Sequence, residues 1–456
     1  MGKIDKESLK SIGIDRLVDL LFDLAQRDDA IEKRLLVATA SNSELTKKVR
    51  SQISGLKRTR KFYDWKSVRR LREKVELTLE AIVALDVEPK MGFKLVVSFF
   101  ETDNAVYGNC DDSSGTIGDL YTYDAVNQLI RFGKHCDDKP WMAEQIFELN
   151  QSDGYGVRDC TLTAACEFLP ETETRKLINR FCELATELDQ NPPENEWNRP
   201  SHRFWCAAES LARGINDGPL YEMAKLSSWG KNKFNAAAWN DIAKVYLKAD
   251  NPETALQKLN NISSDDHFKS YETEQIRIEI NKALGNTDAV AEILRLRFQK
   301  SPTTKTLGEL SELLTAKKVK AVVAKVTKGF NEDPPLDLGF LDFALAELDL
   351  KTAEKYLLTR AEQIDGERYY ILPGLAKQFV AKDSPLAATL IFRALADSIL
   401  KRAVSKNYKI AVGYIKRMAK LDESITNWKK HPSHEDYLKG LRENHARKSA
   451  FWSKMK

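Results

Sequence analysis

The sequence is poor in helix-breaking residues and has no stretch that could cross a membrane. Its 456 residues include only 21 glycines and 14 prolines, which cluster between segments with an apolar residue every three or four positions. No run of about 18 uninterrupted apolar residues occurs, and charges interrupt the opening residues before they reach signal-peptide length. We therefore expect an all-α protein that is located in the cytoplasm and has no membrane partner.

Cysteine is also scarce, and its spacing is irregular. The six cysteines are Cys110, Cys136, Cys160, Cys166, Cys182 and Cys206. They form no C-x-x-C pair, and the sequence carries no export signal that would place them in an oxidising compartment. A disulfide framework is therefore not expected, and the thiols should be reduced and mostly buried.

Motifs of the common enzyme classes are missing. There is no G-x-x-x-x-G-K-[ST] phosphate loop, and the Gly-Tyr-Gly at 154–156 lacks the third glycine of a dinucleotide-binding loop. No G-x-S-x-G elbow occurs, and the H-E-x-x-H pattern that His434 opens has Leu438 where the second ligand would stand. We expect no catalytic residue, no cofactor and no metal, although an enzyme with an unrecognised acidic site stays open.

Such a site would use acids of two polar loops. The candidates are Asp111, Asp112, Asp153 and Asp159. An EF-hand loop starting at Asp111 would need glycine at its sixth position and glutamate at its twelfth, where Thr116 and Thr122 stand. The segment is better interpreted as a solvated turn in which Gly115 and Thr116 precede and cap a short helix.

Basic charge is abundant in two places. Segments 47–74 and 401–456 each carry a net charge of +10, and since the whole chain carries +4, the remaining residues together carry −16. In the first segment the cations alternate with Phe62, Tyr63 and Trp65, a mixture that can neutralise phosphates while stacking on bases. The candidate nucleic-acid-binding cations are Lys57, Arg58, Arg60, Lys61, Lys66, Arg69, Arg70 and Arg72.

A structural interpretation of both basic segments stays open. Phe62 and Trp65 could be core residues at helical spacing, with the charges forming a solvated rim. In the same way, Phe451 and Trp452 could dock a terminal amphipathic helix that caps the last helices of the chain.

Helical periodicity runs through the chain and repeats in its middle. The first helix, with Leu17, Leu21 and Leu24 on one face, should be one arm of a helical hairpin, and residues 93–100 should form a central core helix. The pattern of a tetratricopeptide repeat is matched by Trp239, Ile242, Ala243, Tyr246, Ala255 and Leu259. A weaker copy follows at Ile276, Arg277, Ile280, Ala289 and Ile293.

Two proline-rich breaks, at 189–200 and 331–339, divide the chain into three expected regions. These are an N-terminal helical domain over 1–190, a tetratricopeptide-like region over 200–330, and a C-terminal helical region with its cap over 336–456. The expected fold is therefore a helical-hairpin solenoid preceded by a less regular helical domain.

Several segments resemble a known family. The sequence from 384 to 452 resembles the C-terminus of an uncharacterised bacterial family of helical proteins, which shares this end with bacterial SWIM zinc-finger proteins. KRTRKFYDW at 57–65, DDSSGTIGDL at 111–120 and DGYG at 153–156 extend the resemblance. It implies a helical fold and, since the C-x-C…C-x-H cluster is absent, no zinc binding. It also allows Trp65 to be a structural residue that pins a loop to the core.

These patterns favour a non-enzymatic interaction scaffold that binds a protein or peptide partner through a helical-repeat surface. The alternative is a nucleic-acid-associated protein that uses segments 47–74 and 401–456. An enzyme that uses the four loop aspartates is the third hypothesis.

Overall fold

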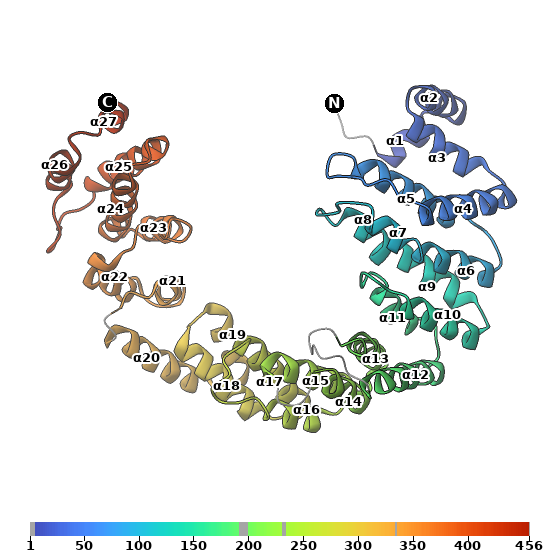
Figure 1. Ribbon diagram of the computed structural model, residues 1–456. Coiled ribbons are helices and arrows are strands. Elements are labelled where there is room, and N and C mark those ends of the chain that lie inside the picture. Colours follow the sequence, from blue (N-terminus) through green and yellow to red (C-terminus); the bar gives the residue numbers. More distant parts are fainter. Residues whose placement is uncertain (1–4, 191–198, 230–233, 333–334, 456) are drawn as a thin grey trace. The chain divides into compact units, whose positions relative to one another are not determined.

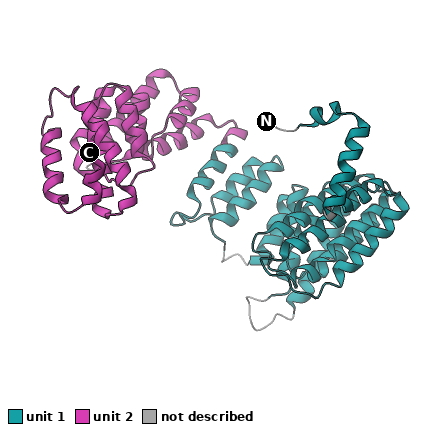
Figure 2. Ribbon diagram, turned by 90° about the horizontal axis from the view of Figure 1, so that it is seen from above, with its two compact units in different colours: residues 1–280 teal, residues 281–456 magenta. Residues whose placement is uncertain are grey.

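The computed structural model describes residues 5–190, 199–229, 234–332 and 335–455, and these are all-helical, as predicted. Within them the one pairing of strand type is a single bridge between Tyr63 and Cys110. None of the described helices is long and apolar enough to cross a bilayer. The chain divides into two compact units, residues 1–280 and 281–456 (Figure 2).

Figure 1 labels the described helices in chain order. Unit 1 contains α1 (Lys6–Ser11), α2 (Ile14–Arg27), α3 (Asp29–Thr39), α4 (Asn42–Lys57), α5 (Val68–Val83), α6 (Pro89–Phe100), α7 (Asp103–Tyr107), α8 (Thr116–Asp119), the π-helix η1 (Leu120–Ala125), α9 (Val126–His135), α10 (Lys139–Gln151), α11 (Asp159–Ala165), α12 (Glu171–Asp189), α13 (His202–Gly214), α14 (Gly218–Trp229), α15 (Ala236–Lys248) and α16 (Pro252–Leu259). Helix α17 (Ser270–Ala283) crosses the boundary between the units.

Unit 2 continues with α18 (Thr287–Lys300), α19 (Thr304–Leu313), α20 (Ala316–Glu332), α21 (Leu338–Glu347), α22 (Leu350–Thr359), the 3₁₀ helix η4 (Ala361–Gln363), α23 (Leu372–Ala381), α24 (Pro385–Arg402), the 3₁₀ helix η5 (Ser405–Asn407), α25 (Tyr408–Asp422), α26 (His434–His445) and α27 (Ser449–Met455). Its longest helix, α24, is buried along most of its length, because α23 and α25 pack against it.

Helix α6 is buried along most of its length and packs against α4, α5, α9 and α10, as its apolar sequence predicts. It begins at Pro89, whose missing N–H is not needed at a helix start, and Glu88 caps it by accepting hydrogen bonds from two backbone N–H groups. Phe93 is fully buried. A Cβ at Gly92 would lie 2.3 Å from the ring of Phe132 on α9, so only glycine allows these two helices to approach so closely.

The predicted repeat segment forms two helices, α15 and α16, that pack against each other. Asn235 caps the first by accepting a hydrogen bond from the N–H of Ala238, and Pro252 opens the second. Ala243 and Ala255 are fully buried, as expected where two helices approach closely. The tetratricopeptide-like stacking of successive pairs stays a prediction.

The two proline-rich breaks lie partly outside the described residues, at 191–198 and 333–334. The two compact units part between residues 280 and 281, within α17 and not at either break. The division into three regions therefore stays a prediction.

Candidate functional site

Two of the segments that carry the family resemblance lie against each other in unit 1. The loop between α4 and α5 runs alongside the loop after α7, since the N–H of Tyr63 donates to the carbonyl of Asn109 over 2.8 Å, and the N–H of Asp111 donates to the carbonyl of Tyr63 over 2.9 Å. The side-chain amide of Asn109 also donates to the carbonyl of Thr59 over 3.0 Å. We call these contacts the loop tether.

The aromatic residues of the basic segment divide between core and surface. Tyr63 is buried, and its hydroxyl accepts a hydrogen bond from the ammonium of Lys74 over 3.1 Å. Phe62 is 61% exposed and Trp65 is 70% exposed. The interpretation of Phe62 and Trp65 as core residues is therefore wrong. Tyr63, and not Trp65, pins this loop, because it is the residue that makes the bridge.

The eight candidate cations divide into those with and those without an acidic partner, and of the latter Lys66 lies over the ring of Trp65, 5.1 Å from its centre. Lys57 pairs with Glu101 over 2.5 Å, Arg72 with Glu76 over 2.9 Å, and Arg69 with Glu73 over 3.3 Å. No carboxylate of the described residues lies within ion-pair distance of the other five, which are exposed: Arg58, Arg60, Lys61, Lys66 and Arg70. These five cations, with Phe62 and Trp65, form what we call the cationic loop.

A shallow groove adjoins the cationic loop. It lies between α4 and α6, has a volume of about 400 Å³, and is lined by Arg50, Lys57 and Lys94 together with apolar side chains such as Leu95. The groove and the loop are continuous, because Ser54 lines the groove and its carbonyl accepts a hydrogen bond from Arg58 Nε over 3.0 Å. A chain of cations therefore extends from the loop onto the helices.

The carboxylates of Asp111 and Asp112, in the turn beside the loop, accept hydrogen bonds from backbone N–H groups of the same turn. Asp112 Oδ2 accepts from the N–H groups of Ile117 and Gly118, each over 3.0 Å, and so caps α8. Gly115 has a φ of 70° and makes the turn that allows this. The predicted capped turn is present, although its cap comes from Asp112. Asp111 accepts from the N–H of Ser113 over 3.2 Å.

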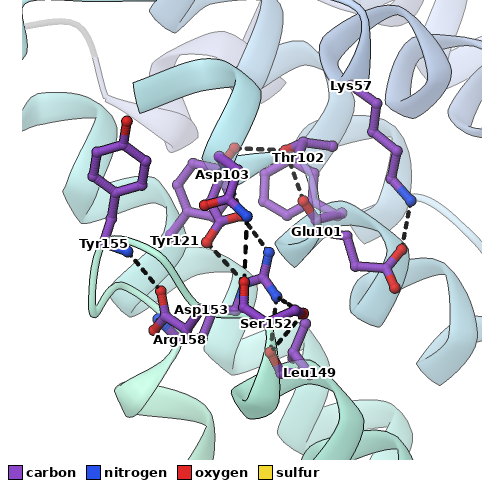
Figure 3. Close-up of polar contacts among 12 residues, drawn as sticks. Lys57, Glu101, Thr102, Asp103, Tyr121, Leu149, Ser152, Asp153, Tyr155 and Arg158 are labelled. Carbon is purple, nitrogen blue, oxygen red and sulfur yellow. Dashed lines mark hydrogen bonds and ion pairs between the residues drawn. The ribbon is translucent and has the colours of Figure 1, made fainter. Parts of the chain in front are cut away.

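A buried ion pair between Asp103 and Arg158 connects the segments that carry these loops (Figure 3). Asp103 and Arg158 have side chains that are 0% and 2% exposed, and their two hydrogen bonds measure 2.8 and 2.5 Å. Arg158 also donates to the carbonyl of Leu149 over 2.8 Å and to the hydroxyl of Ser152 over 2.7 Å. These contacts join α7 to the end of α10 and to the start of α11. This pair cannot be predicted from the sequence, since its members lie 55 residues apart.

The segment DGYG at 153–156, which also carries the family resemblance, is joined to the buried ion pair through Arg158. Asp153 accepts hydrogen bonds from the N–H groups of Tyr155 and Gly156, both over 2.9 Å, and from that of Arg158 over 3.0 Å. The ring of Tyr155 then stacks on Tyr107, with ring centres 5.5 Å apart. Since Tyr107 lies just before the residues that bridge to Tyr63, all three segments meet at one edge of unit 1.

The hydrogen bonds to the carboxylates of the candidate acids come from within their own two loops. Burial, aided by the charge of Asp153, raises the pKa of Asp159, whereas Asp111 and Asp112 belong to the other loop. Burial also raises the pKa of Tyr107, and the nearby charge of Asp112 adds to this. In the described part of the chain, no three His, Cys, Asp or Glu side chains come together in a group that could hold a metal ion.

The second basic segment differs from the first in its aromatic residues. Phe451 of α27 is fully buried and makes an edge-to-face contact with Tyr408 of α25, with ring centres 5.9 Å apart. Trp452 is partly buried, and its indole N–H donates to the carbonyl of His445 over 2.9 Å. The aromatic residues of α27 therefore dock it on the preceding helices, as the capping interpretation expected.

The fold and this edge define an all-helical protein that presents a tethered loop rich in cations and exposed aromatic rings. The chain belongs to the family of unknown function DUF6880, whose model matches residues 2–217 and 223–454. This agrees with the resemblance to an uncharacterised family. No curated protein and no solved structure matches the chain.

Proposed function

We propose that this protein is a non-enzymatic nucleic-acid-binding protein, and that a single strand lies along the cationic loop and the groove between α4 and α6. The observation that carries the proposal is the exposure of Phe62 and Trp65 between cations without acidic partners. Exposed aromatic rings can stack on unpaired bases, while guanidinium and ammonium groups neutralise the phosphates. This combination favours a single strand over a duplex, whose bases are already stacked.

The number of cations without an acidic partner determines how steeply the binding affinity should fall with salt concentration. Each phosphate contact with a single strand contributes roughly −0.7 to the slope of log K against log salt. Contacts from Arg58, Arg60, Lys61, Lys66 and Arg70 would together give a slope of about −3.5. The affinity should then fall by roughly two decades when the salt concentration rises about fourfold.

The test is fluorescence anisotropy with labelled single-stranded RNA and DNA of mixed sequence at several salt concentrations. We expect binding at low salt with the slope given above. Replacing Phe62 and Trp65 by alanine should weaken binding at least about tenfold at every salt concentration, since base stacking contributes about 1–3 kcal/mol for each base. The triple change R60E, K61E and K66E should both weaken binding and flatten the slope.

The matched control reverses three exposed cations of α20, as K317E, K318E and K325E. This variant has the same net charge as the loop variant but leaves the cationic loop intact. Absence of binding by the wild-type protein at the lowest salt concentration would refute the proposal. Equal weakening by the control and the loop variant would also refute it, because binding would then follow net charge alone.

We also propose that the fold that carries this surface is a helical-hairpin solenoid, with tetratricopeptide-like pairing of helices over 200–330. The close packing of α15 on α16 supports it. A cytoplasmic location, a bacterial origin and kinship with the SWIM zinc-finger proteins are proposals of the same kind, and the resemblance of 384–452 supports the last two.

A further inference from the structure

Lysines line a cavity in unit 2. The cavity has a volume of about 550 Å³ and lies between α22 and the loop that joins α25 to α26. Its charged lining residues are Lys351, Glu354, Lys355, Lys429 and Lys430. Four positive charges against one negative charge give the lining a net charge of +3 when His431, its remaining titratable residue, is neutral. The cavity is therefore complementary to an anion.

The positive charge of the cavity resides on three lysines. The ammonium of Lys429 lies 3.6 Å from the carboxylate of Glu354, so the one acidic residue of the lining compensates this cation. No carboxylate of the described residues lies within ion-pair distance of Lys351, Lys355 and Lys430, which are all exposed. These three ammonium groups are therefore available to a ligand.

The backbone on both sides of the cavity holds these lysines in place. Lys351 and Lys355 are four residues apart on α22, so they lie on the same face, about 6 Å apart along the helix axis. On the other side, Lys429 has a φ of 51°, and its N–H donates to Asn427 Oδ1 over 2.7 Å. This hydrogen bond fixes the turn that carries Lys430. The cations therefore reach the cavity from two elements of defined backbone geometry.

The lining also indicates the class of anion. Its volume lies within the range of small-molecule sites, which is about 300–1,000 Å³. Among the described residues, no phenylalanine, tyrosine or tryptophan lines the cavity, so it offers no ring on which a base could stack. Three ammonium groups call for about three negative charges, whereas one phosphate monoester carries about 1.5 to 2. Two or more linked phosphates match this charge.

We propose that this cavity binds an oligophosphate, a small anion with two or more linked phosphate groups. Lysine binds phosphate as a point charge with three rotatable donors, so it can adapt to phosphate oxygens in several geometries. The ammonium groups of Lys351, Lys355 and Lys430 contact these oxygens, while Lys429 stays paired with Glu354. This site is separate from the cationic loop of unit 1, and neither proposal requires the other.

His431 provides a signal for occupancy of the cavity. Burial holds the pKa of its imidazole below the ordinary value, and the charges of Lys430 and Arg393 lower it further, whereas Glu362 acts in the opposite direction. An oligophosphate beside the ring favours the charged imidazolium, so binding should raise this pKa. His445 also belongs to unit 2 but does not line the cavity, and its pKa should not change.

The experiment is titration calorimetry of the full chain with inorganic triphosphate at low salt. We expect saturable binding, and inorganic phosphate should bind at least about tenfold more weakly because it brings fewer charges. The cavity variant, with K351E, K355E and K430E, should also bind triphosphate at least about tenfold more weakly, since three attractions become repulsions. A pH titration of the wild type by NMR, with and without triphosphate, follows the two histidines.

The matched control carries K317E, K318E and K325E on α20 of the same unit, which change the net charge by the same amount. It should bind triphosphate as the wild type does. The variant of the cationic loop described above should also keep this binding, because its substitutions lie in unit 1. Far-UV circular dichroism checks that all variants keep their helices.

A wild-type protein that does not bind triphosphate at low salt overturns the proposal. Equal weakening by the α20 control and the cavity variant overturns it as well, because binding would then follow net charge. An unchanged pKa of His431 in the bound protein would place the anion elsewhere. Loss of single-strand binding in the cavity variant would assign the cavity to the nucleic acid and not to an oligophosphate.

Discussion

At the scale of single residues, we expect the Asp103–Arg158 pair to contribute strongly to the free energy of unfolding. Both side chains are buried, and D103A would leave the guanidinium without its carboxylate. We expect this variant to lose about 3–5 kcal/mol of the free energy of unfolding, because an uncompensated buried charge is strongly destabilising. Urea unfolding followed by circular dichroism measures the change.

The control for this prediction removes both charges. A double variant with D103L and R158M should lose less stability than D103A alone, because apolar side chains can often replace a buried ion pair at little cost. If D103A unfolds at the same urea concentration as the wild type, the pair does not stabilise the fold as we describe.

At the scale of elements, the position of the cationic loop depends on the loop tether. Asn109 donates hydrogen bonds to the carbonyls of Thr59 and Ala105, over 3.0 and 2.8 Å. N109A should lower stability by only about 1–2 kcal/mol. It should nevertheless weaken binding of single-stranded RNA severalfold, although it removes no cation and no exposed ring.

Hydrogen exchange distinguishes this loosening from a general loss of structure. In N109A the amide of Tyr63 should exchange faster, because the bridge to Asn109 opens more often. The amides of α6 should be unchanged. Unaltered affinity together with faster exchange at Tyr63 would show that the tether does not position the loop for binding.

The sequence predicts those helices whose pattern of apolar and small residues lies within one short segment. Helix α6 was expected because the segment around Phe93 is continuously apolar, and the α15–α16 pair was expected from the spacing of small residues such as Ala243. The opening helix is also predicted as one arm of a hairpin, and α2 does pack against α3. Leucines of its predicted face nevertheless stay partly exposed, since Leu21 is 37% and Leu24 47% exposed. Periodicity identifies an apolar face, but it does not tell what covers that face.

The candidate site depends on contacts that are distant in the sequence. In KRTRKFYDW, helical spacing favours Phe62 and Trp65 as core residues, whereas the buried ring is that of Tyr63, which a bridge to Asn109 and Asp111 holds in place. In the same way, Asp103 and Arg158 stand out only when the helices bring them together. The cations of this segment could therefore be identified from the sequence, whereas the direction of each aromatic ring could not.

At the scale of the whole molecule, the two compact units predict unfolding in more than one step. When most contacts are made between neighbouring elements, separate regions can lose structure at different denaturant concentrations. D103A in unit 1 should then move one urea transition. F340A should move the other, because Phe340 is fully buried in unit 2 between the rings of Phe330 and Tyr356.

The size of the second shift provides a check. Removing a buried phenylalanine ring costs about 3–5 kcal/mol, so the transition of unit 2 should move to clearly lower urea. Following tryptophan fluorescence and circular dichroism together separates the two steps. A single transition that both variants move equally would show that the chain unfolds as one cooperative block.

The loop tether has a thermodynamic consequence for any ligand of the cationic loop. A free loop of this length would lose conformational entropy when a ligand ordered it, and that loss would weaken binding. Here the bridge of Tyr63 to Asn109 and Asp111 already restricts the backbone in the unbound protein. The ordering cost is therefore met during folding, and calorimetry should find only a small unfavourable conformational entropy on binding.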